Sequence, residues 1–182
     1  MSIRVSIDAS GGDFGFPVTI NAGINALKAY DDLLVNFVGD QTGIEKELKN
    51  NALFLKFQSR IEITHASEVI NMDDSPSVAL RHKKDSSMRV AINLVKNGDA
   101  DACVSAGNTG ALMSIARFVL KTISGVDRPA IMSAVPTLTG PTHVLDLGAN
   151  IDSKPSTLLQ FAIMGSIAVQ NTENIDTPSI GL

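Results

Sequence analysis

Apolar residues along the chain follow two different periods. At Ile3, Val5 and Ile7 they recur at every second position, which predicts a strand with one buried face. Between Leu112 and Leu120 they recur at three and four positions, which predicts a helix with one buried face. By these patterns the predicted strands cover residues 3–8, 34–38, 60–64, 102–104, 129–135 and 143–147. The predicted helices begin near residues 17, 43, 76, 87, 109 and 155.

Strand and helix signals alternate along the chain. Repeated units of this kind predict an α/β fold with a mainly parallel sheet that helices cover on both faces. We expect a single α/β domain over residues 1–182, since no repeat of fixed period and no linker rich in Pro, Gly and Ser interrupts it. Residues 177–182 are typical of a turn that leads into another strand, so we expect the N-terminal half of a longer chain. The alternative is a short edge strand at a natural end.

Three local signals predict helix ends. The run Thr42-Gly43-Ile44-Glu45 fits a capping box, which places the start of the second helix at Thr42. Ser86 or Asp85 is expected to cap the helix that follows, and Gly98 to end it.

Composition narrows the class of protein. A net charge of −4 argues against a general nucleic-acid binder, and 44% apolar with 19% charged residues indicates a globular chain. No apolar run has the length of a membrane span and no basic-then-apolar leader opens the chain, so we expect a cytoplasmic protein. Cys103 is the single cysteine, which leaves no internal disulfide and predicts a small buried side chain rather than a reactive thiol.

Three predicted strands end in similar loops, at residues 8–13, 105–110 and 146–152. Each loop places glycine beside Asp, Asn or Ser. Because the carboxyl ends of parallel strands share one edge of a sheet, where ligands bind in open α/β folds, we expect the three loops to converge on one site.

The loop at 105–110 has the strongest signal for ligand binding. A strand, a tight glycine turn and a helix start aim backbone N–H groups at one point, where the helix dipole adds positive charge that suits phosphate. Gly107 and Gly110 do not match the dinucleotide fingerprint, and no Lys-Ser/Thr pair follows as in a nucleotide phosphate loop. The alternative is that Asn108 or Thr109 only caps the helix.

The two other loops carry carboxylates. Asp8 and Asp13 have the chemistry to bind a metal or to act as a base, but an unbridged carboxylate beside a phosphate site repels the anion. The alternative for the loops at 8–13 and 146–152 is a tight turn with helix-capping side chains.

The only basic cluster is Arg81-His82-Lys83-Lys84 with Arg89 nearby. It is either a solvated helix face or an anion site and docking patch for an acidic partner, where Arg81 would grip phosphate with two parallel hydrogen bonds. The histidines lack metal-ligand spacing, and Ser105 lies outside a nucleophile elbow, so structural roles are expected for them.

Seven ordered motifs carry a family resemblance from residue 3 to the last residue. They are Ile7 to Asp13, Ser75-Pro76 with Ala79-Leu80-Arg81, Lys84 to Met88, Ser105 to Leu112, Arg128-Pro129-Ala130, Leu147 to Asn150 and Gln160 to Gly165. In this order they resemble the bacterial phosphate acyltransferase (PlsX) family of phospholipid synthesis. The chain departs from the usual first motif at Ser10, where the family has Met.

The resemblance implies a fold and an activity. The fold is a Rossmann-like three-layer α/β/α architecture akin to phosphotransacetylases and isopropylmalate-dehydrogenase-like enzymes. The activity is transfer of a long-chain acyl group from acyl carrier protein to inorganic phosphate, giving acyl-phosphate, with no metal or cofactor. Members are cytosolic homodimers that associate peripherally with the membrane. Their chains are nearly twice as long, so part of the active site is expected to lie outside this chain.

We hypothesise that the backbone N–H groups of Gly107 through Gly110 cradle phosphate, helped by Asn108 and Thr109. The candidate catalytic residues are Asn108 and Asn150, and the candidate binding residues are Gly11, Gly12, Ser105, Gly107, Thr109, Gly110, Arg81 and Lys84. In this hypothesis Asn150 and the Gly11-Gly12 turn form the adjacent wall, and Arg81 or Lys84 steers phosphate or the acidic carrier protein. Two alternatives stay open: a phosphotransacetylase-like enzyme that uses coenzyme A thioesters, and an inactive fragment or phosphate-binding module.

Overall fold

The computed structural model describes residues 2–138, 140–147 and 154–182. By their internal contacts the residues fall into two compact units, Met1–Lys121 and Thr122–Leu182. That residues 1–182 make a single α/β domain stays a prediction.

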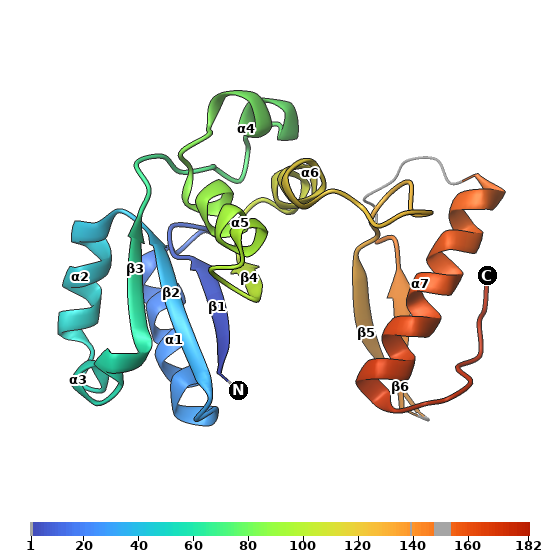
Figure 1. Cartoon of the computed structure of the whole chain (residues 1–182), viewed down its shortest axis with the longest axis horizontal. Coiled ribbons are helices and arrows are strands. Elements are labelled where there is room, and N and C mark those ends of the chain that lie inside the picture. Colours follow the sequence, from blue (N-terminus) through green and yellow to red (C-terminus); the bar gives the residue numbers. More distant parts are fainter. Residues whose placement is uncertain (1, 139, 148–153) are drawn as a thin grey trace. The chain divides into compact units, whose positions relative to one another are not determined.

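The first unit contains a four-stranded sheet in the order β3-β2-β1-β4 (Figure 1). Its strands are β1 (Ile3–Asp8), β2 (Leu33–Gly39), β3 (Ile61–His65) and β4 (Ala102–Ser105). Every neighbouring pair is parallel, and β1 lies between β2 and β4. The predicted parallel sheet is therefore confirmed for the first four strands.

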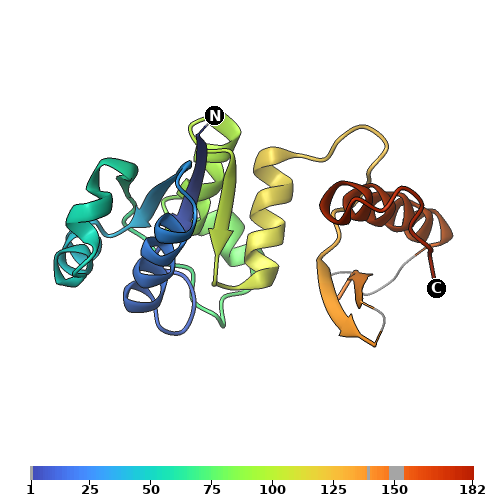
Figure 2. The ribbon, with the colours of Figure 1, turned by 90° about the horizontal axis from the view of Figure 1, so that it is seen from below.

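Helices cover both faces of this sheet (Figure 2). They are α1 (Phe16–Ala29), α2 (Gln41–Asn50), α3 (Phe54–Phe57), α4 (Pro76–His82), α5 (Ser87–Asn97) and α6 (Thr109–Leu120), and a 3₁₀ turn at Gln58–Arg60 follows α3. On one face, Ile20 and Leu27 of α1 pack with Phe37 of β2 in a buried cluster. On the other face, Ala91 of α5 packs with Val38. Helix, sheet and helix thus form three layers, which confirms the Rossmann-like α/β/α prediction.

The first cluster depends on close approach between α1 and the sheet. A Cβ atom added to Gly23 of α1 would lie 2.5 Å from Cζ of Phe37, which is fully buried. Only a residue without a side chain fits there, so Gly23 sets how near α1 lies to β2.

Two of the three predicted helix ends are confirmed. The Ser86 hydroxyl accepts a hydrogen bond from the N–H of Arg89 and caps α5, and Gly98 ends that helix with a φ of 81°. A left-handed conformation of this kind favours glycine, because it has no Cβ to clash.

The predicted capping box at Thr42 to Glu45 is wrong. Helix α2 begins one residue earlier, at Gln41, and Asp40 is its cap: the carboxylate accepts a hydrogen bond from the N–H of Gly43 at 2.8 Å. Glu45 instead accepts from the Gln41 side chain at 2.8 Å. Asp at the N-cap satisfies a free N–H group and complements the helix dipole, so it takes the place that the sequence pattern gave to Thr42.

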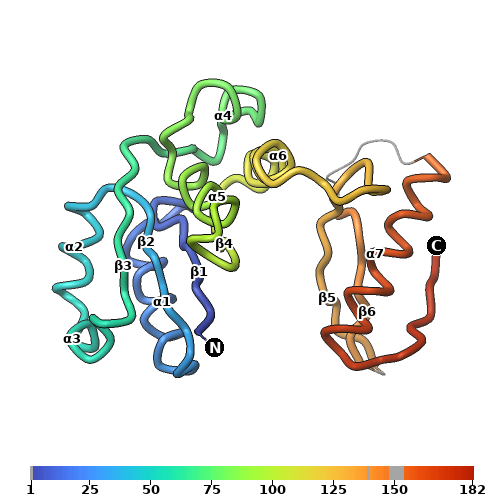
Figure 3. The backbone as a smooth tube through the Cα atoms, viewed as in Figure 1, coloured from blue at the N-terminus to red at the C-terminus, as the bar shows by residue number. Residues whose placement is uncertain are grey.

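The second unit contains an antiparallel strand pair and one long helix, whose path Figure 3 traces. The elements are β5 (Met132–Thr137), β6 (Gly140–Leu145) and α7 (Pro155–Glu173). The two strands were expected in a mainly parallel sheet, and this is wrong: β5 and β6 pair with each other in antiparallel register. Only residues 138 and 139 separate them, whereas a parallel connection needs about a dozen residues. Residues 177–182 lie in no strand.

Candidate functional site

The carboxyl ends of β1 and β4 bring two glycine turns together. Asp8 and Ser105 are register partners on these adjacent strands. A Cβ atom added to Gly11 would lie 3.1 Å from the backbone N of Gly107, and one added to Gly12 would lie 3.0 Å from the Ala106 carbonyl oxygen. The turns at 8–13 and 105–110 are therefore in contact, and their approach requires glycine at both positions.

The third predicted loop does not extend the same sheet. Asp146 and Leu147 follow β6, which belongs to the antiparallel pair of the second unit. The expectation that this strand ends at the edge shared by β1 and β4 is wrong for that reason. Residues 148–153 lie outside the described residues, and Asn150 is among them.

A chain of hydrogen bonds links the two turns below their surface. The Ser105 hydroxyl donates to Oδ2 of Asp8 at 2.7 Å and accepts from the N–H of Gly107 at 3.0 Å. The side chain of Ser105 is thus engaged as a link between two strands rather than presented as a nucleophile. The N–H of Gly107 has a partner inside the protein, which removes it from the predicted phosphate cradle.

Asp8 is a buried carboxyl group, only 1% exposed. Burial raises its pKa above the usual value, although hydrogen bonds from the Ser87 and Ser105 hydroxyls act in the opposite direction. Among the described residues its Oδ1 atom has no partner in hydrogen-bond geometry. The sequence suggested that Asp8 binds a metal or acts as a base. It did not predict the pairing of Asp8 with Ser105, because that pairing depends on the register of β1 and β4.

Asn108 holds the start of α6 with both ends of its amide. Its Oδ1 accepts from the N–H of Ala111 at 3.0 Å, which confirms it as the helix cap. Its Nδ2 lies 3.3, 3.1 and 2.8 Å from the carbonyl oxygens of Asn71, Met72 and Asp74. The side chain is 9% exposed. Asn108 therefore fastens the 71–74 segment to the helix.

Two donors at the start of α6 are available to a ligand. In the part of the chain that the structure describes, the N–H groups of Thr109 and Gly110 have no hydrogen-bond partner. They stand in the first turn of a 12-residue helix, where N–H groups are unsatisfied within the helix and the dipole is positive. Beside them lies the Gly11-Gly12 turn, with Gly12 at a φ of 83°. The arrangement suits a small oxyanion.

The basic cluster divides into structural and exposed members. Lys83 is structural: it forms an ion pair with Asp74 that lowers the pKa of that carboxyl, and it donates to the Val69 carbonyl at 2.7 Å. Arg81 and Lys84 are the members of this cluster that were predicted to bind phosphate or the carrier protein, and both are exposed. Among the described residues no hydrogen bond or ion pair joins either of them to the glycine turns, so their placement fits a solvated face or a docking patch.

The comparisons with known proteins place the chain in a family. The family model described as "Fatty acid synthesis protein" matches residues 3–182. The chain belongs to this family. A relative called "Phosphate acyltransferase" from Vesicomyosocius okutanii is 64% identical over 185 residues, covering 100% of this chain and 53% of the relative.

Two more relatives agree. The proteins called "Phosphate acyltransferase" from Legionella pneumophila (strain Paris) and Methylococcus capsulatus are 56% and 54% identical, over 100% and 98% of this chain. The chain spans about half the length of the curated relatives it matches, 52–53%. The predicted resemblance to phosphate acyltransferases is thereby confirmed.

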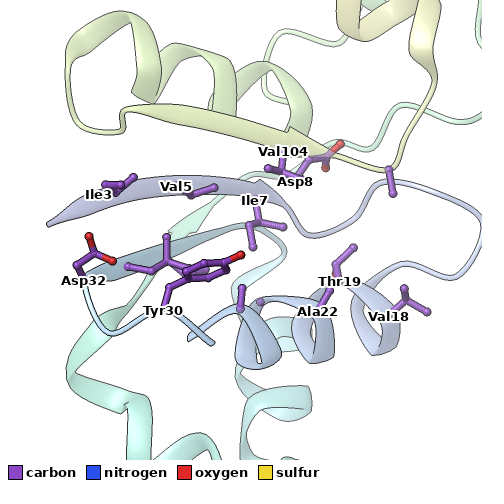
Figure 4. Close-up of a pocket in the computed structure, with 15 residues that line it drawn as sticks. Ile3, Val5, Ile7, Asp8, Val18, Thr19, Ala22, Tyr30, Asp32 and Val104 are labelled. Carbon is purple, nitrogen blue, oxygen red and sulfur yellow. The ribbon is translucent and has the colours of Figure 1, made fainter. Parts of the chain in front are cut away.

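In this member of the fatty acid synthesis protein family a separate apolar groove runs beside α1 (Figure 4). Its volume is about 560 Å³, and its walls come from β1, β2, β4 and α1, with Val5, Ile7, Val18 and Val104 among the lining residues. Asp8 also lines it. The lining is almost wholly apolar, so the groove is not the anion cradle.

The remaining sequence candidates have structural surroundings. Cys103 is partly buried against two core clusters, and burial raises the pKa of its thiol to about 11, which agrees with a packing role rather than a reactive thiol. His143 of the second unit lies 3.2 Å from the Glu173 carboxylate. The described residues contain no cluster of three His, Cys, Asp or Glu side chains able to hold a metal. A membrane-spanning helix is likewise not found among them.

Proposed function

We propose that the edge formed by β1, β4 and the start of α6 binds inorganic phosphate, and that the whole protein transfers a long-chain acyl group from acyl carrier protein to that phosphate. The observation that carries the proposal is the pair of unpartnered N–H groups on Thr109 and Gly110, beside the Gly11-Gly12 turn. The name phosphate acyltransferase, borne by relatives up to 64% identical, supports it.

The proposed reaction is attack of a phosphate oxygen on a thioester carbonyl. The new acyl–oxygen bond forms, the acyl–sulfur bond breaks, and the proton of hydrogen phosphate passes to the departing thiolate of the carrier. Thiolate is a good leaving group, so the protein's main task is to hold phosphate beside the carbonyl and to stabilise the developing negative charge.

The residues divide this task between backbone and side chains. Thr109 and Gly110 offer their N–H groups to phosphate oxygens, with Gly12 in the neighbouring wall. Gly107 and Ser105 shape the turn from within, and Asn108 positions the helix start through its cap. Asn150, outside the described residues, stays in the proposal as a second catalytic side chain.

The binding partners and the location of the protein are also proposals. Exposed Arg81 and Lys84 would attract acyl carrier protein, whose surface is acidic, or steer phosphate. We further propose a cytoplasmic homodimer that associates with the membrane surface.

The experiment uses proline to delete one backbone donor. Thr109→Pro removes the N–H at the first helical position, where proline is well tolerated, and Asn108 before it already has a ψ of 110° that suits a following proline. Thr109→Ala is the matched control, since it keeps the N–H. We expect phosphate affinity, measured by titration calorimetry, to fall about tenfold or more in Thr109→Pro and little in Thr109→Ala.

Equal affinity in the two variants would remove Thr109 from the site. The acyl donor is tested on the full-length Vesicomyosocius okutanii relative by measuring acyl-phosphate formation from acyl carrier protein thioesters and coenzyme A thioesters. A clear preference for coenzyme A would replace the proposed donor.

A further inference from the structure

Asp8 lies directly under both glycine turns. A Cβ atom added to Gly11 would lie 2.5 Å from Oδ2 of Asp8, and one added to Gly107 would lie 3.5 Å from the same atom. The carboxyl is 1% exposed, its Oδ2 accepts from Ser105, and its Oδ1 has no hydrogen-bond partner among the described residues. Most buried polar atoms in proteins have a partner, so an unpartnered carboxylate oxygen under a candidate anion site calls for an explanation.

The groups that face Asp8 give it hydrogen bonds but no opposite charge. Ser105 and Cys103 face it from β4, Ser87 from α5, and its own turn contributes the backbone of Ser10 and Gly11. None of these carries a positive charge. In the described ranges no Lys, Arg or His side chain forms an ion pair with Asp8. Burial raises the pKa of the carboxyl, and the hydrogen bonds from Ser87, Ser105 and the turn backbone lower it only in part.

An anion bound above the turns would meet this carboxyl through protein rather than water. The repulsion between like charges across several ångströms of protein is large enough to change affinity on the order of tenfold. A proton on Asp8 removes the repulsion. Oδ1 is the atom placed to carry the proton, because Oδ2 already accepts a hydrogen bond from Ser105.

We propose that oxyanion binding at the two glycine turns is coupled to uptake of one proton by Asp8. The proposal rests on the proposed phosphate site and assigns Asp8 as the residue that sets its pH-dependent affinity. Asp8 acts through its charge and through Ser105, so it is a positioning residue and not a catalytic one.

The test measures proton uptake by this chain during anion binding. Sulfate is the first probe, because it does not titrate near neutral pH and every proton taken up must then enter the protein. Titration calorimetry at a series of pH values from 5 to 8, each in two buffers of different ionisation enthalpy, gives the number of protons, and phosphate is the second probe. We expect the wild-type chain to take up a fraction of a proton and Asp8→Asn to take up none.

The affinity for sulfate gives a second, independent test of the coupling. Asp8→Asn mimics the protonated carboxyl, so at pH 8.5 it should bind sulfate about tenfold more tightly than the wild type, and this difference should shrink as the pH is lowered. Asp13→Asn is the matched control: it removes one charge from the same turn at an exposed residue and should leave proton uptake unchanged.

Sulfate binding by the wild type without proton uptake would overturn the proposal, with no variant needed. The same uptake in Asp8→Asn would overturn it too, by moving the proton to another group such as a histidine. If the wild type binds neither phosphate nor sulfate, the proposed phosphate site itself fails. Failure of the proton coupling can therefore be distinguished from failure of the phosphate site.

Discussion

The sharpest prediction concerns Asn108, whose amide both caps α6 and fastens the 71–74 segment. Asn108→Ala removes the acceptor at 3.0 Å from the N–H of Ala111 and the donors that face three carbonyl oxygens. Losing an N-cap costs about 1 kcal/mol. An amide nitrogen has two hydrogens, so at most two of the three contacts count, at about 0.5–1.5 kcal/mol each. The expected loss in the free energy of unfolding is about 2–4 kcal/mol.

A second substitution separates the two roles of Asn108. Asn108→Asp keeps a good cap but removes both donors and turns an oxygen towards the carbonyl groups, so it should cost about 2 kcal/mol despite the cap. Asp40→Ala is the matched control, because Asp40 is an exposed cap with one hydrogen bond, to Gly43. It should cost about 1 kcal/mol.

Urea unfolding measures these differences. Tyr30 is the only tyrosine and the chain has no tryptophan, so tyrosine fluorescence reports on the first unit alone, with far-ultraviolet circular dichroism as a second probe. The reasoning is refuted if Asn108→Asp is as stable as the wild type, or if Asn108→Ala loses no more than Asp40→Ala.

Three other predictions concern buried groups. Because the pKa of Asp8 is raised in the folded state, its ionised form destabilises the fold at neutral pH. Asp8→Asn should therefore raise the urea midpoint at pH 7, and this gain should shrink as the pH falls towards 4. A difference in midpoint that does not depend on pH would contradict this reasoning. Gly23→Ala should lower the free energy of unfolding by about 1–3 kcal/mol, because the added methyl group forces Phe37 aside. An unchanged urea midpoint would show that the core accommodates the methyl group. Cys103, with a pKa of about 11, should react with a disulfide reagent at pH 8 far more slowly in the folded chain than in urea.

Much of the fold could be predicted because its signals are local. The alternation at Ile3, Val5 and Ile7 and the glycine after Asn97 each reflect a few neighbouring residues, and the strand and helix they predict are present. The short helix α3 was not predicted, since four residues carry too little period to recognise. The pairing of β5 with β6 was mistaken because periodicity shows that a strand exists and not which strand it joins.

The candidate site likewise has features that local signals predict and features that depend on contacts between distant residues. The strand, glycine turn and helix at 105–110 could be read from the sequence, as could Asn108 as a cap, since a cap is a contact between residues three positions apart. The role of Lys83 could not, because its partners Asp74 and Val69 lie in a segment that folds back only in the complete unit.

By itself, then, the sequence determined that an N–H-bearing turn precedes α6 and that glycine permits it. Only the tertiary structure decided which N–H groups remain free. Parallel pairing of β1 with β4 sets Asp8 beside Ser105, 97 positions away, and the Ser105 hydroxyl then takes the N–H of Gly107. Hydrogen bonds between distant residues depend on strand register, which no local pattern contains, so the donors left on Thr109 and Gly110 are a property of the folded sheet.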